Sequence, residues 1–172
     1  MNYADHTINN CTSAPGLTYG SSDGTKVKIA NTTFFKVNGR SMYVAGAEVS
    51  LVGATLQAPF PNGTAQTAGT LAFDDGTVPV TTNSCRVYAI VATVAETEAG
   101  TVTLSAIAGA DFPKHRQTQA NDFPTPNASD SCILGWIYIK CETAAFIPGT
   151  TNLHSVSGQT VTYTDNYAQS GR

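Results

Sequence analysis

Residues 132–141, CILGWIYIKC, are the stretch on which the fold prediction for this chain depends. Side chains alternate between the two faces of a β-strand, so a strand with one wet face alternates apolar and polar residues. This stretch is apolar on both faces. One face would carry three isoleucines and a glycine, and the other would carry Leu134, Trp136 and Tyr138. Such a strand is expected at the centre of a β-structure, with both of its faces covered.

Other segments have the same β character. Residues 85–94, CRVYAIVATV, predict a long strand that is largely apolar on both faces from Val87 to Val94. Residues 101–107, TVTLSAI, alternate and predict one wet face. Asn38-Gly39 lies between two short apolar runs and predicts a two-residue hairpin, because both residues tolerate the positive φ that such a turn requires. No segment has a helical period over three turns. We therefore predict an all-β fold, an antiparallel β-sandwich or a small barrel with a jelly-roll or meander path.

The domain organisation follows from composition along the chain. Residues 1–25 are polar and rich in turn-forming residues, without an apolar period, and they predict a polar N-terminal arm. This arm would either be a frayed terminus or become ordered on a neighbouring molecule. Residues 26–172 are predicted to form a single β domain.

Composition and charge exclude some classes of partner. Of the 172 residues only 12% are charged, against about 25% in an average soluble domain, and the net charge is −3. Phosphate-backbone binding needs clustered Lys and Arg, so nucleic acid is not an expected partner. A membrane is not expected either, since no segment approaches the roughly 18 consecutive apolar residues of a membrane span. A surface with so little charge suits a protein embedded in an assembly.

Catalytic and metal-binding patterns are absent from the sequence. The histidines show neither HxH nor HExxH spacing, and there is no phosphate-binding glycine-rich loop or nucleophile elbow. We predict no enzymatic activity, no cofactor and no metal. The four cysteines form no CxxC pair, and we interpret them as small buried thiols in a reducing compartment.

The two-faced strand has two explanations. The partner sheet could cover one face while a loop, residues 108–131, covers the other. Alternatively, a neighbouring subunit could cover that face, and this oligomeric explanation is the one we favour, as a homotrimer. The residues expected at the subunit interface are large apolar side chains of the two central strands: Leu134, Trp136, Tyr138, Tyr88 and Ile90.

Three segments resemble small virion proteins of tailed bacteriophages that decorate heads or form short fibres. They are residues 35–40 (FKVNGR), 134–139 (LGWIYI) and 146–151 (FIPGTT), and the resemblance extends over roughly residues 26–164. It implies a β-rich and usually trimeric protein that sits on the capsid lattice and clamps neighbouring capsid subunits, without catalysis.

On this basis we expect a capsid decoration (cement) protein of the head surface, assembled in the host cytoplasm, whose partner is the major capsid protein. The residues expected to contact the capsid are Tyr3, His6, Tyr19, Lys114 and Arg116. The alternative is a host-recognition module of a tail or head fibre that binds cell-surface glycan through aromatic and amide side chains on exposed loops. An enzyme such as a depolymerase is the least favoured possibility.

Overall fold

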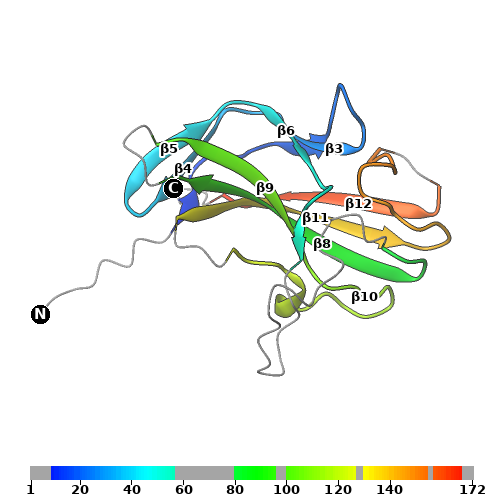
Figure 1. Ribbon diagram of the computed structural model, residues 1–172. Helices are drawn as coiled ribbons and strands as arrows, with labels where there is room; N and C mark the ends of the chain where they lie inside the picture. The colour runs from blue at the N-terminus through cyan, green and yellow to red at the C-terminus, as the bar shows by residue number, and fades with distance from the viewer. Residues whose placement is uncertain (1–8, 57–79, 96–99, 127–129, 155–156, 168–172) are drawn as a thin grey trace, which may run out of the picture.

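The structure is a computed structural model that describes residues 9–56, 80–95, 100–126, 130–154 and 157–167. These residues form β-sheets that pack in two layers, and a segment that contains β10 lies under the larger, six-stranded sheet (Figure 1). The predicted all-β sandwich is confirmed. The alternative prediction of a small barrel is wrong, because the strands of the described part form three separate sheets and no closed barrel.

The larger layer is a six-stranded sheet with the two predicted central strands in its middle. Its strands, in spatial order, are β12 (Gln159–Asp165), β11 (Ser131–Cys141), β8 (Ser84–Val94), β9 (Val102–Ala108) and β7 (Thr55–Leu56), while β10 (Phe112–Pro113) pairs with the start of β8. All neighbours are antiparallel except β7 and β9, which are parallel. β8 and β11 are thus shielded by neighbouring strands on both edges.

The other layer consists of two three-stranded sheets. One contains β1 (Asn10–Cys11), β4 (Thr33–Val37) and β5 (Arg40–Val44), and the other contains β2 (Leu17–Tyr19), β3 (Lys26–Ile29) and β6 (Ala47–Ser50). The predicted hairpin is confirmed, because β4 and β5 pair with Val37 opposite Arg40. Between them Asn38 and Gly39 have φ values of 50° and 75°. Its two-residue turn therefore has the positive φ angles that its sequence requires.

The prediction of a polar arm over residues 1–25 is wrong for the part that the structure describes. Residues 9–25 contain β1 and β2, and Cys11 and Leu17 are buried in the core. The Asp165 carboxylate accepts hydrogen bonds of 2.9 Å from the backbone N–H groups of Gly16 and Leu17, which ties β2 to the end of β12. Each strand buries a single apolar residue, so no periodicity marks either in the sequence. Residues 1–8 lie outside the described residues.

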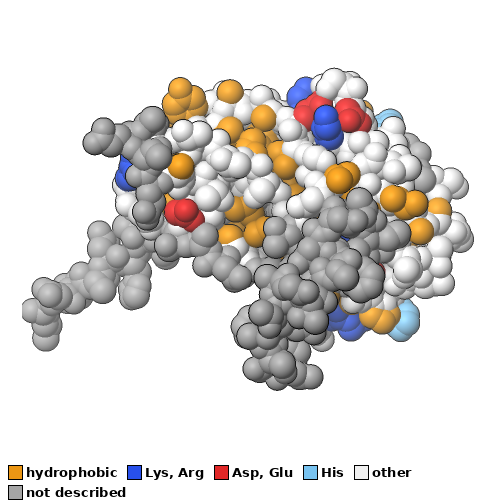
Figure 2. Space-filling model, viewed as in Figure 1, with side chains coloured by type: hydrophobic (Ala, Val, Ile, Leu, Met, Phe, Trp, Pro, Cys, Tyr) orange, Lys and Arg blue, Asp and Glu red, His pale blue; other side chains and the backbone are white. Residues whose placement is uncertain are grey.

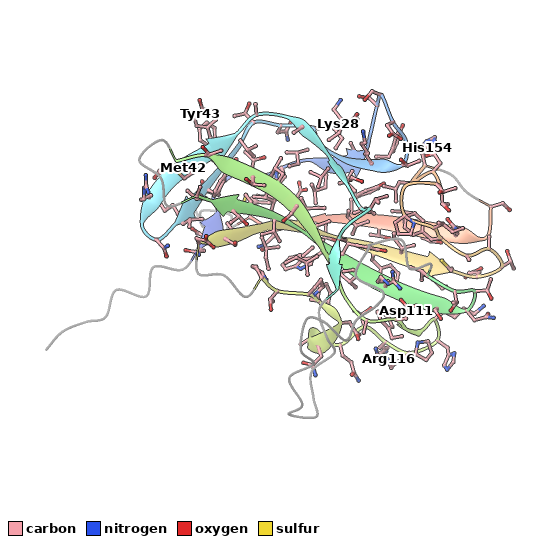
Figure 3. All side chains as sticks on the ribbon, in the orientation of Figure 1. Lys28, Met42, Tyr43, Asp111, Arg116 and His154 are labelled. Carbon is pink, nitrogen blue, oxygen red and sulfur yellow. The ribbon has the colours of Figure 1, made fainter. Side chains whose placement is uncertain are left out.

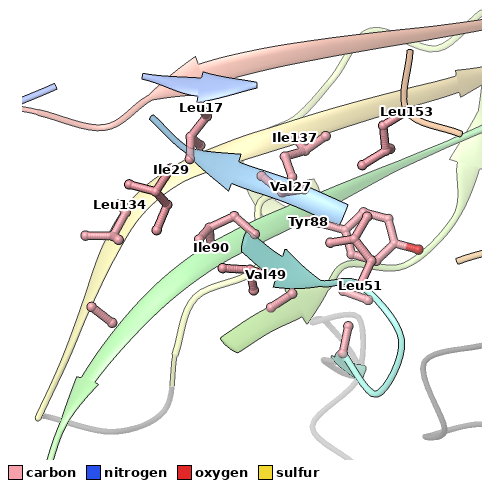
Figure 4. Packing of buried hydrophobic residues seen from close by; sticks show 14 of the residues in the cluster. Leu17, Val27, Ile29, Val49, Leu51, Tyr88, Ile90, Leu134, Ile137 and Leu153 are labelled. Atoms are coloured by element: carbon pink, nitrogen blue, oxygen red, sulfur yellow. The ribbon is translucent and has the colours of Figure 1, made fainter. Parts of the chain in front are cut away.

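The main core lies between the two layers (Figure 4). Tyr88 and Ile90 of β8 face it together with Ile137 of β11, and all three side chains are buried. β3 covers them with Val27 and Ile29, which are also fully buried. The predicted burial of the four cysteines is confirmed, and none of them forms a disulfide.

A β-bulge in β11 changes which residues share a face. The register against β8 shifts between Ile133 and Gly135, so that one extra residue is inserted into β11. As a result Leu134 points into the main core together with Ile137. The prediction that Leu134 shares a face with Trp136 and Tyr138 is therefore wrong. Side chains alternate strictly between the two faces of a strand only where its pairing contains no bulge.

Candidate binding surfaces

The outer face of β11 is covered by the same chain. A covering segment, residues 109–126, contains β10 and a short 3-10 helix, η1 (Ala120–Asp122), and runs under the six-stranded sheet (Figure 1). Its Phe123 packs edge-on against Trp136 with ring centroids 5.6 Å apart, and its Phe112 lies 6.2 Å from Tyr138. The structure thus matches the loop explanation for this face, and a second subunit is not needed to explain its apolar side chains.

Arg116 holds the covering segment together. Its Nη2 lies 2.6 Å from Oδ1 of Asp122, and its guanidinium lies over the Phe112 ring, 4.6 Å from the centroid. The other carboxylate oxygen of Asp122 accepts a hydrogen bond of 2.7 Å from the backbone N–H of Gln119. Arg116, predicted to contact a capsid, is therefore engaged inside the chain, while Lys114 is half-buried on the same segment (Figure 3 labels Arg116).

The five predicted interface residues fall into two groups. Tyr88, Ile90 and Leu134 expose at most 1% of their surface and have none to offer to a second subunit. Trp136 and Tyr138 are half-buried beside the covering segment. The Tyr138 hydroxyl lies 3.0 Å from the Cys85 sulfur, and burial raises the Tyr138 pKa.

An aromatic pair that the sequence reasoning did not single out is exposed on the outer face of the β4–β5 hairpin. Phe34 and Tyr43 lie opposite each other in the ladder, with ring centroids 6.1 Å apart, and are 53% and 64% exposed. Figure 3 shows Tyr43 at one end of the molecule, where apolar side chains reach the surface in Figure 2. Lys36 and Ser41 are exposed on the same face.

This pair could have been found from the sequence. The two-residue turn at Asn38-Gly39 fixes the register, and counting outward from it places Phe34 opposite Tyr43. Alternation then places Phe35 and Met42 on the other face, toward the core. We call the exposed face that carries Phe34, Lys36, Ser41 and Tyr43 the hairpin surface.

A pocket of about 380 Å³ lies between the edge strands β2 and β12. The residues that line it come from these two strands and from the segment before β12: Thr18, Tyr19, Leu153, His154, Gln159, Thr160, Val161 and Tyr163. The rings of Tyr19 and His154 are 4.2 Å apart, centroid to centroid, and both side chains are exposed. Tyr19, predicted to touch a partner, thus belongs to a concave site.

Hydrogen bonds fix the floor of this pocket. The Tyr163 hydroxyl donates to the Leu153 carbonyl oxygen at 3.3 Å, and burial raises the pKa of Tyr163 to about 12. The Gln159 Nε2 donates to the Ala145 carbonyl oxygen at 2.7 Å, which leaves the amide oxygen facing away from that contact. This Oε1 atom is buried and has no hydrogen-bond partner among the described residues.

One charged network lies at the edge of the main core. Arg86 is 4% exposed, and its Nε lies 2.7 Å from Oδ1 of Asp111. Its Nη1 donates to the Tyr88 hydroxyl at 3.1 Å, and burial raises the pKa of Tyr88. The network pairs a buried guanidinium with a carboxylate, because burying an unpaired charge is very unfavourable.

The described residues contain no group of three or more His, Cys, Asp or Glu side chains that could hold a metal ion. In the same residues no helix has the length and hydrophobicity to cross a membrane. Tyr3 and His6, which were also predicted to contact a capsid, lie outside the described residues. Comparisons with protein families, curated proteins and solved structures find no match. The functional evidence in this chain is therefore the chemistry of the hairpin surface and of the pocket.

Proposed function

We propose that this protein is a non-enzymatic structural protein that docks on a larger protein assembly, as a decoration (cement) protein of a bacteriophage head. Its partner would be the major capsid protein, and its place the outer surface of the assembled shell. The observation that supports this proposal best is the pair of exposed aromatic rings on the hairpin surface.

Two aromatic rings exposed by more than half are unfavourable on a free protein and favourable in an interface. Burying a large apolar side chain contributes roughly 1.5–3 kcal/mol, and aromatic residues are enriched among those that dominate binding energy. Because Phe34 and Tyr43 sit on a hydrogen-bonded hairpin, they lose little conformational freedom when they bind.

The charge around the pair indicates what the partner surface carries. Lys36 is exposed on the same face, and Arg40 is exposed at the turn. A partner with an apolar pocket edged by carboxylates would complement this arrangement. Among the described strands β5 has a neighbour on one side only, so it is an edge strand there. An edge strand can extend its ladder onto another chain.

The homotrimer remains part of the proposal on the strength of the resemblance alone. Of the five residues predicted at its interface, only Trp136 and Tyr138 keep exposed surface. If three copies associate through the six-stranded sheet, they meet over the covering segment, where Phe123 is 39% exposed.

Rebinding to shells tests the proposal. Particles that lack this protein should be less resistant to heat and low salt, and adding the purified protein should restore resistance. The double variant Phe34→Ser/Tyr43→Ser should bind at least tenfold more weakly, because it removes both rings without touching the core. Ile147→Ser, which changes another exposed apolar side chain at 39% exposure, is the matched control. If the double variant binds shells as tightly as the unchanged protein, the hairpin surface is not the site that contacts the shell.

The second candidate function is recognition of cell-surface glycan by a fibre or head module. The pocket between β2 and β12 favours it, because it combines exposed aromatic rings with amide and hydroxyl groups.

A further inference from the structure

We infer that the pocket between β2 and β12 binds one ring of a neutral saccharide, stacked against Tyr19. This inference deepens the second candidate function. It is independent of the hairpin surface, which belongs to another sheet of the same layer.

The position and size of the pocket suit one sugar ring. Among the described strands β2 and β12 lie at the edges of the two layers, and the pocket lies between these edges. Its volume of about 380 Å³ is at the lower end of the range for ligand sites, which is roughly 300–1,000 Å³. A single six-membered ring with its hydroxyl groups fits such a space, and the rest of an oligosaccharide would lie outside it.

The aromatic wall supplies the apolar contact that sugars require. Tyr19 is 37% exposed, and the ring of His154 supports it at 4.2 Å. The hydroxyl of Tyr163, which also lines the pocket, is bound to the Leu153 carbonyl oxygen and holds that ring in place. A rigid aromatic face can pack against the C–H groups of a pyranose at little entropic cost.

The polar groups supply the directional contacts. Thr18 and Thr160 contribute hydroxyl groups that can both donate and accept hydrogen bonds. Gln159 contributes a buried amide oxygen without a partner among the described residues, although its amide nitrogen is fixed by the Ala145 carbonyl. This oxygen is not exposed to the pocket, so the Gln159 amide has to turn when a ligand hydroxyl donates to it. The new hydrogen bond would remove the cost of leaving a buried acceptor without a partner.

The charge of the lining selects the class of sugar. The described residues that line the pocket include no Asp, Glu, Lys or Arg, so none of them has a fixed charge that could pair with a carboxylate, sulfate or phosphate. Burying the charged group of a ligand without such a partner costs free energy. The pocket is therefore expected to prefer neutral hexoses and N-acetylhexosamines over sialic acid and sugar phosphates.

Binding to the purified full-length protein tests the inference. Saturation-transfer NMR and calorimetric titration would use glucose, galactose, mannose and N-acetylglucosamine, with sialic acid and glucose 6-phosphate for comparison. For a ligand of this size we expect a dissociation constant on the order of 1 mM for at least one neutral sugar. Tyr19→Ala and Gln159→Met should each weaken binding about tenfold or more. Val52→Ala, which changes an exposed apolar side chain outside the pocket lining and outside the hairpin surface, should leave it unchanged.

Three results would overturn the inference: no neutral sugar binds at 50 mM, only the charged sugars bind, or Tyr19→Ala binds as tightly as the unchanged protein. Circular dichroism of each variant establishes that it is folded. The two candidate functions fail separately, because shell binding is measured with the Phe34→Ser/Tyr43→Ser variant and sugar binding with the Tyr19→Ala variant.

Discussion

The two layers approach each other closely at Gly135. A Cβ atom at this position would lie 2.5 Å from the Leu17 Cδ1 and closer still to the Thr164 carbonyl oxygen. The bulge in β11 and the passage of β2 over it therefore both depend on a residue without a side chain.

Replacing Gly135 by alanine should destabilise the protein by about 1–3 kcal/mol, the usual cost of overpacking a core, because the Thr164 backbone and β2 would have to move apart. Urea unfolding monitored by circular dichroism measures this change. An unchanged midpoint would mean that β2 does not lie against β11 as described.

Asp165 fixes β2 through two backbone hydrogen bonds. Its carboxylate accepts from the N–H groups of Gly16 and Leu17, and a hydrogen bond to a charged group contributes about 1.5–3 kcal/mol. Asp165→Ala should therefore lower the free energy of unfolding by about 2 kcal/mol or more. Glu142→Gln, which breaks the exposed ion pair with Lys140, is the control and should have little effect. Equal effects of the two substitutions would argue against the Asp165 contact.

At the scale of elements, the covering segment is tested by the single tryptophan of the chain. Phe123→Ala removes the ring that packs edge-on against Trp136, and such an aromatic pair contributes about 1 kcal/mol. We expect a loss of stability of that size, together with Trp136 emission at longer wavelength and stronger quenching by acrylamide. Tyr43→Ala should leave the emission unchanged. If Phe123→Ala leaves both emission and quenching unchanged, another part of the molecule shields Trp136.

The elements differ in how far the sequence predicts them. The β4–β5 hairpin is predictable because its turn chemistry is local, and Asn38-Gly39 has few alternatives. β8 and β11 are predictable as long apolar strands. β1 and β2 are not, because their stability comes from distant partners such as Asp165. The bulge is not predictable from the sequence either, because the apolar residues around Gly135 are compatible with a strand in either register.

At the scale of the whole molecule, buried thiols and phenols make stability sensitive to alkaline pH. Burial raises the pKa of Cys132 and of Tyr163 to about 12 each, and the pKa values of Tyr88 and Cys141 rise for the same reason. In the unfolded chain these groups lose their protons from about pH 8.5 for Cys and about pH 10 for Tyr. Between those values and the folded pKa the native state binds more protons, so stability decreases as pH rises.

We therefore expect the unfolding midpoint in urea to be flat from pH 6 to 8 and to fall from about pH 9 upward. Tyr163→Phe should make the fall less steep, since it removes one of the groups that release a proton on unfolding. Denaturant titrations at fixed ionic strength measure both effects. A midpoint that stays constant up to pH 11 would contradict the burial of these groups.

The binding surfaces show why a site is harder to predict than a fold. The predicted interface consists of apolar side chains on central strands. Such side chains can belong to the core of the chain as well as to a subunit interface, and Tyr88, Ile90 and Leu134 belong to the core. The pocket depends on Tyr19 meeting Gln159 between the edges of the two layers, 140 positions apart in the sequence by subtraction. Its partners become visible only once β2 is placed opposite β12.

Cryo-electron microscopy of particles that carry this protein tests the proposed function most directly. The proposal predicts density for the β-sandwich on the outer head surface, with Phe34 and Tyr43 against capsid subunits. Density at the tail tip, or on the head with the hairpin surface facing solvent, would contradict it.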